Sequence, residues 1–114
     1  MDSEQTGASP FFAALADPTR LRLIQALARQ SAEEPLCVHA LAEHLGVSQP
    51  AISQHLRVLR NLGIVRAERR GPRVHYFLDQ GRFGQWRKVA QEALNVPIAR
   101  NEAVACKQDS RCRR

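Results

Sequence analysis

Residues 38–62, VHALAEHLGVSQPAISQHLRVLRNL, decide the fold, because they predict two short helices joined by a tight turn. In the first helix, apolar residues recur at the three- and four-residue spacing of one helix face: Val38, Leu41, Ala42 and Leu45. Gly46 follows, at the position where helices commonly end in a left-handed residue. Ser48 is then a candidate N-cap, and Pro50 lies in the first turn of the second helix, where its missing N–H costs little.

The second helix is predicted to present a polar face suited to a DNA groove. Its apolar residues form one stripe, Ile52, Leu56, Leu59 and Leu62, and Gly63 ends it. Outward-facing amide, hydroxyl and guanidinium groups can bind base edges and phosphates. Any amphipathic helix has a polar face, so a merely solvated surface remains the alternative. The candidate DNA contacts of this helix are Ser48, Gln49, Pro50, Ser53, Gln54, His55 and Arg57.

Composition and charge favour one small, mostly helical domain with a polyanionic partner. The chain has 114 residues, with 17 Lys and Arg against 11 Asp and Glu, a net charge of +6. Residues 57–73 contain six arginines and the single acid Glu68. Such clustering is typical of a phosphate-binding surface, although a basic surface without a ligand would look the same.

Residues 64–79 predict a β-hairpin directly behind this helix. Segments 64–70 and 73–79 have strand character around Gly71-Pro72, and Val74, Tyr76 and Leu78 alternate with Arg73, His75 and Phe77. A hairpin in this place forms the wing of a winged helix-turn-helix, a mainly helical fold with a small β-hairpin. We expect Arg69, Arg70 and Arg73 to contact the DNA backbone; an ordinary charged hairpin end is the alternative.

The terminal helices are predicted to form a dimer interface. A helix over residues 81–94 and another that begins at Ser9 both carry aromatic anchors. The first helices already cover the recognition helix, so these apolar stripes have a second subunit available as partner. Packing within one chain is the alternative. The candidate interface residues are Phe11, Phe12, Leu15, Phe83, Trp86, Val89, Ala90 and Ala93.

The predicted organisation has three parts. Residues 1–8 are expected to be a flexible N-terminus, 9–95 the DNA-binding and dimerisation domain, and 96–114 a basic, cysteine-containing tail. Between the first two helices, Asp17 is a candidate N-cap, with Pro18 at the first helical position.

Three segments resemble the ArsR/SmtB family of winged-helix repressors: ALADPTRLRLIQAL (14–27), LCVHALAEHLGVSQPAISQHLRVLRNLGIV (36–65) and RRGPRVHYFL (69–78). The resemblance implies a homodimer that binds operator DNA and releases it when an inducer binds. Many members respond to metals or metalloids, whereas others respond to reactive sulfur or to no known ligand.

The same resemblance implies where an inducer ion would bind. Family members carry Cys-x-Cys at the start of the first helix of the helix-turn-helix, and this chain keeps Cys37 but has His39 in place of the second cysteine. The zinc-type site of the last helix is absent, because that helix has no histidine. Cys106 and Cys112 loosely match a variation with cysteines near the end of the chain.

These thiols favour As(III), with Cd(II), Pb(II) or Hg(II) as further candidates, because thiolates select soft ions. Three alternatives remain. Cys37 could be a small buried apolar residue, the tail cysteines could be incidental in a disordered tail, or Cys106 and Cys112 could react with a thiol oxidant instead of an ion. His75 has no partner at ligand spacing, so we expect it to be a structural strand residue.

Other function classes find little support. No apolar run approaches the roughly 18 residues of a membrane span, and no signal-peptide pattern begins the chain. We therefore expect a cytoplasmic protein without membrane contact and without an obligatory cofactor. No phosphate-binding loop, paired carboxylates or Ser–His–Asp pattern indicates an enzyme. The remaining rival is a winged helix that binds nucleic acid non-specifically or binds another protein.

Overall fold

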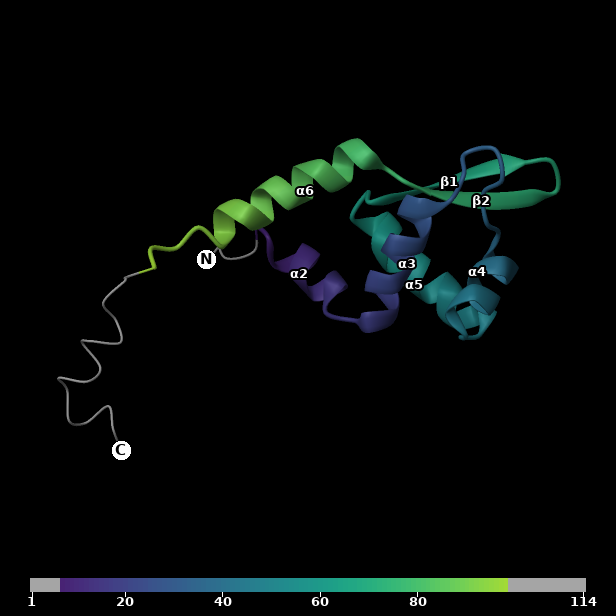
Figure 1. The fold of residues 1–114 in the computed structure, drawn as a ribbon, viewed down its shortest axis with the longest axis horizontal. Coiled ribbons are helices and arrows are strands. Elements are labelled where there is room, and N and C mark those ends of the chain that lie inside the picture. Colours follow the sequence, from purple (N-terminus) through teal and green to yellow (C-terminus); the bar gives the residue numbers. More distant parts are fainter. Residues whose placement is uncertain (1–6, 99–114) are drawn as a thin grey trace, which may run out of the picture.

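The helix-turn-helix is the centre of the fold, in a computed structural model that describes residues 7–98 (Figure 1). Helix α4 (Val38–Leu45) ends at Gly46, whose φ of 70° is left-handed. Helix α5 (Gln49–Asn61) begins after Ser48, whose hydroxyl accepts a hydrogen bond from the Ala51 N–H at 3.2 Å. Both predicted helix ends are confirmed, so the turn is fixed by a glycine on one side and a capping serine on the other.

Two helices precede this pair and cover its inner side. Helices α2 (Ser9–Leu15) and α3 (Pro18–Arg29) are separated by Asp17. The Asp17 carboxylate accepts hydrogen bonds from the N–H groups of Arg20 (3.1 Å) and Thr19 (2.8 Å), which lower the pKa of that carboxyl group. The predicted N-cap and the proline at the first helical position are therefore present.

The wing is an antiparallel hairpin of β1 (Val65–Arg70) and β2 (Arg73–Leu78), with a register that runs from Val65↔Leu78 to Arg70↔Arg73. Each strand is one residue shorter than predicted. Ile64 is fully buried in the core and accepts a hydrogen bond at its carbonyl from the Asp79 N–H at 2.7 Å. The Asp79 carboxylate caps the next helix by accepting from the Arg82 N–H at 2.9 Å. A single antiparallel bridge also pairs Cys37 with His75, so the residue before α4 lies alongside β2.

The last described helix, α6 (Gln80–Ala93), leaves the hairpin and passes over α2 (Figure 1). It buries little of its surface, and Ala90 is its one fully buried residue. None of the helices between residues 7 and 98 is both long and apolar enough to cross a membrane.

The core lies where α3, α4 and α5 meet the start of the wing. Its most completely buried side chains are all aliphatic: Leu23, Leu41, Ile52, Leu56, Leu59 and Ile64. No polar or charged residue is buried among the residues that the structure describes. The apolar stripe of α5 is thus buried in the core, and the opposite face of that helix is left for a partner.

Candidate nucleic-acid interface and cysteine site

The exposed face of α5 carries most of the predicted DNA contacts. Ser48, Gln49, Pro50, Ser53, Gln54 and Arg57 are all exposed. A groove runs along this face toward the hairpin and is lined by Ser53, Leu56, Arg57, Arg60, Asn61 and Tyr76. Polar donors and two guanidinium groups therefore lie together beside a concave surface.

Arg60 and Tyr76 also line this groove. Arg60 is one of the six arginines of residues 57–73 but was not a named candidate contact, and Tyr76 was not predicted. Arg60 follows Ser53 and Arg57 at helical spacing, so the sequence did carry a signal for it. Tyr76 comes from β2, and only the fold brings it to α5.

His55 differs from the other predicted contacts of this helix in its surroundings. Its Nδ1 lies 3.2 Å from Nη1 of Arg20, and the Arg20 Nε donates to the Ala14 carbonyl at 2.7 Å. His55 is half-buried because it stands at the edge of the apolar stripe, three residues after Ile52. It joins α5 to the α2–α3 junction and does not face outward with the other candidates.

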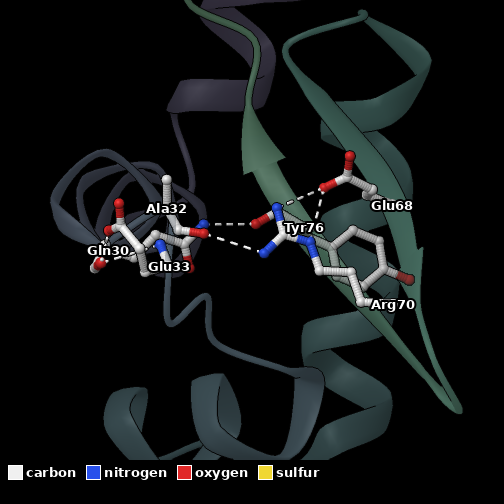
Figure 2. Close-up of polar contacts among 7 residues, drawn as sticks. Gln30, Ala32, Glu33, Glu68, Arg70 and Tyr76 are labelled. Carbon is white, nitrogen blue, oxygen red and sulfur yellow. Dashed lines mark hydrogen bonds and ion pairs between the residues drawn. The ribbon is translucent and has the colours of Figure 1, made fainter.

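Arg70, a predicted backbone contact, makes several contacts within the chain. Its Nε and Nη2 donate to Oε1 of Glu68 at 3.1 and 2.9 Å, and its Nη1 donates to the Ala32 carbonyl at 3.1 Å, as Figure 2 shows. Its guanidinium also lies 5.0 Å from the ring centroid of Phe77. Each guanidinium nitrogen of Arg70 already donates one hydrogen bond within the chain, so we expect Arg69 to be the better candidate for a phosphate contact at this end of the hairpin.

The predicted dimer residues divide into a packed set and an exposed set. Phe11 is only 3% exposed and stacks on Trp86, with ring centroids 5.7 Å apart and planes at 10°. Phe83 meets Phe11 edge-on at 5.8 Å, and the Trp86 indole N–H donates to the Leu62 carbonyl at 2.9 Å.

Phe11, Phe83, Trp86 and Ala90 thus pack α6 against α2 and α5 within one chain, and Leu15 packs against the core. Phe12 and Val89 remain 38% and 39% exposed. Ala93 and Leu94, at the end of α6, are exposed as well.

Cys37 occupies the N-cap position of α4 and is a half-buried free thiol. The Ala40 and His39 N–H groups at the start of the helix, together with the Arg73 guanidinium, lower the pKa of this thiol, although no capping hydrogen bond of good geometry forms. Nη1 of Arg73 lies 3.8 Å from the Cys37 Sγ. The lowered pKa makes the thiolate, which is the metal-binding and nucleophilic form, easier to reach than in an unperturbed cysteine.

His39 is engaged elsewhere. Its Nδ1 lies 2.9 Å from the Gln49 Nε2, and its Nε2 lies 3.5 Å from Oε2 of Glu43. Within residues 7–98, no three His, Cys, Asp or Glu side chains gather in a way that could hold a metal ion. Cys106 and Cys112 lie outside the described residues.

Comparison with known proteins agrees with the winged helix-turn-helix architecture. Residues 17–67 match the pattern described as "Bacterial regulatory protein, arsR family". A transcriptional repressor SmtB homolog of Synechocystis is 48% identical over 81 residues, covering 70% of this chain and 58% of the relative. A probable mercury resistance operon repressor of Streptomyces lividans is 47% identical over 66 residues, covering 58% and 50%. The chain thus matches little more than half the length of these curated relatives.

Solved structures extend the likeness to the whole domain. A possible transcriptional regulator for arsenical resistance superposes with a TM-score of 0.62 at 33% identity, covering 83% of this chain and 92% of that one. A homodimeric winged helix-turn-helix domain from Mycobacterium bovis, a possible ArsR-family regulator, gives 0.59 at 26% identity, covering 78% and 80%. The chain belongs to the arsR family, which is a family of transcriptional regulators and not of enzymes.

Replacing Trp86 by phenylalanine tests its placement inside the chain. The smaller ring could still stack on Phe11, but the hydrogen bond to the Leu62 carbonyl would be lost, so we expect a loss of about 1 kcal/mol in the free energy of unfolding. Denaturant unfolding followed by circular dichroism at two protein concentrations measures this. A loss that appears only at the higher concentration would instead place Trp86 between subunits.

Proposed function

We propose that this protein is a dimeric transcriptional repressor that binds operator DNA through α5 and the wing, and that a thiophilic metal or metalloid bound at cysteine releases it. The observation that carries the DNA-binding half is the groove of α5, where Ser53, Arg57 and Arg60 lie together and exposed polar groups continue toward the helix start. Family membership supports the regulatory half.

The contacts divide into two kinds. Gln49, Ser53, Gln54 and Arg57, near the start of α5, are the proposed readers of base edges, where amide and guanidinium groups can make paired hydrogen bonds. Arg60, Arg69 and Arg73 supply charge to the phosphate backbone and carry no sequence information.

Arg69 and Arg70 provide a matched test of the wing. Arg69→Ala should weaken binding about equally on operator and random duplexes and reduce the salt slope by about 1, because one phosphate contact is lost. Arg70→Ala should leave the slope nearly unchanged, since its donors serve Glu68 and Ala32. Fluorescence anisotropy over a series of salt concentrations gives both slopes, and equal slopes for the two variants would refute the assignment.

The proposed dimer uses the apolar surface that one chain leaves uncovered. Phe12 of α2 and Val89 of α6 are exposed, and Leu94 extends this surface at 66% exposure. The Mycobacterium bovis relative is described as homodimeric. Two recognition helices on a symmetric dimer can meet successive major grooves, about 34 Å apart.

Val89→Glu tests that surface. A charge placed in an apolar interface should weaken dimerisation at least about tenfold, equivalent to about 1.4 kcal/mol. Gln91→Glu adds the same charge to α6 at another exposed position and serves as the control. Sedimentation over a range of concentrations measures the equilibrium, and equal dissociation of both variants would rule out Val89 as an interface residue.

The inducer half of the proposal rests on the thiol chemistry. Cys37 has a lowered pKa at a helix N-terminus, which favours a soft ion. Cys37, Cys106 and Cys112 together could supply the three sulfurs that As(III) prefers, and related proteins are described as regulators of mercury and arsenical resistance. The ion needs only to bind the DNA-free conformation better than the DNA-bound one.

A thiol-based redox or reactive-sulfur switch is the second candidate function. The observation that favours it is the same lowered pKa of Cys37, because a thiolate is also the form that oxidants attack. The two mechanisms share the fold and differ in whether the signal is coordination or covalent chemistry.

A release experiment separates these mechanisms. Reduced protein on labelled operator DNA is titrated with As(III), Cd(II), Pb(II), Hg(II) and Zn(II), next to Cys37→Ser, Cys106→Ser and Cys112→Ser. We expect a thiophilic ion to lower anisotropy to that of free DNA, and each serine that removes a ligand to abolish the response. Release by an oxidant alone, reversed by reductant, would establish the redox switch, and no release by either would contradict both.

A further inference from the structure

We propose that His75, and not His39, is the imidazole that joins Cys37 in binding a soft divalent cation such as Cd(II) or Hg(II). The inference deepens the proposed function, on which it rests, by naming a ligand that spacing along the sequence does not suggest. It also shifts the expected inducer from As(III) toward a divalent cation, because As(III) prefers sulfur whereas these divalent ions accept imidazole nitrogen as well.

The fold places these two residues side by side. Cys37 and His75 form an antiparallel β-bridge, although 38 positions separate them in the chain. Residues directly opposite each other in such a pair project their side chains to one face, with Cβ atoms about 4.5–5.5 Å apart. Arg73, two residues before His75, shares that face by strand alternation, and its contact with the Cys37 Sγ at 3.8 Å agrees with this.

One ring nitrogen of His75, Nδ1, is buried and has no hydrogen-bond partner among the described residues. Glu68 pairs with His75 from the other side of the hairpin, but its carboxylate is held by Arg70 at 2.9 Å. A buried polar atom without a partner is rare in folded proteins and points to a missing ligand.

His39 is the weaker candidate ligand of the two histidines. Both of its ring nitrogens have partners, Gln49 at 2.9 Å and Glu43 at 3.5 Å, and its side chain is 64% exposed. An ion at Nδ1 of His39 would displace the contact to Gln49, and an ion at Nε2 would displace the contact to Glu43. Binding at His75 would instead satisfy an atom that now has no partner within residues 7–98.

Coordination at Cys37 and His75 has a direct consequence for the wing. The thiol gives up its proton to solvent as the sulfur–metal bond forms, and the neutral imidazole donates the Nδ1 lone pair while Nε2 keeps its hydrogen. A cation at the sulfur repels the guanidinium of Arg73, so Arg73 must leave its present place. Since Arg73 is a proposed phosphate contact, the ion and the DNA compete for the arrangement of one side chain.

The test compares His75→Gln with His39→Gln in the full-length chain. Both tail cysteines are changed to serine so that Cys37 is the only thiol. Cd(II) is added against a competing chelator, and the thiolate-to-metal absorption band reports binding. We expect His75→Gln to lower Cd(II) affinity about tenfold or more and His39→Gln to change it less than about twofold. The reverse order, or equal effects, would overturn the assignment.

A second readout keeps the assignment testable if His75→Gln does not fold. In the protein that retains both histidines, the ring nitrogen resonances are assigned through the backbone and followed as Cd(II) is added. A large shift of Nδ1 of His75, with His39 unchanged, is expected; an unchanged His75 would refute coordination there.

Operator release, measured in parallel, distinguishes this site from the proposed function. Cd(II) that binds His75 without releasing DNA would leave the site intact and remove its role as an inducer site. Release that persists in a folded His75→Gln protein with an intact tail would preserve the inducer function and overturn the contribution of His75.

Discussion

The rest of the structure depends on how the apolar stripe of α5 is covered. Ile52, Leu56 and Leu59 are almost completely buried, and α3, α4 and Ile64 supply the cover. Because these partners all approach from one side, the opposite face of α5 stays exposed over its whole length. Two polar contacts also hold this helix in place. The Trp86 indole donates to the Leu62 carbonyl at the end of the helix, and Arg20 contacts His55 near its middle. Rigid presentation of the exposed face follows from these contacts.

A second set of contacts ties the wing to the body. The Gln30 side chain donates to the Tyr76 carbonyl at 2.7 Å (Figure 2). It also accepts from the Leu36 N–H at 2.8 Å, so one amide joins β2 to the segment before α4. Arg70 reaches the Ala32 carbonyl in the same loop. The hairpin therefore cannot move independently of the residues that lead into Cys37, and a change at this thiol acts on the wing through a few direct bonds.

What the sequence could predict was local. Asp17, Gly46 and Ser48 cap or end helices by contacts within a few residues, so their types and positions were sufficient. The errors came from contacts between distant segments. Strand alternation predicts that Phe77 lies on a polar face of the hairpin, and that face is basic. Phe77 is nevertheless buried, because the guanidinium of Arg66 covers its ring at 4.9 Å from the centroid. The engagement of Arg70 by Ala32 could not be read from spacing for the same reason.

At the cysteine site too, contacts between distant segments differ from what local sequence indicates, and this difference affects the proposed sensor. The family resemblance indicated His39, which stands in place of the second cysteine of Cys-x-Cys. In the structure α4 begins between the two residues, and His39 contacts Gln49. Strand pairing instead brings His75 opposite Cys37, a relation that no local pattern encodes. If an ion at Cys37 and His75 displaces Arg73, it weakens DNA binding by some factor. Because coupling free energy is reciprocal, bound DNA must weaken ion binding by the same factor. An ion-binding site at this position would thus act directly on a proposed DNA contact, because Arg73 already contacts the Cys37 thiol.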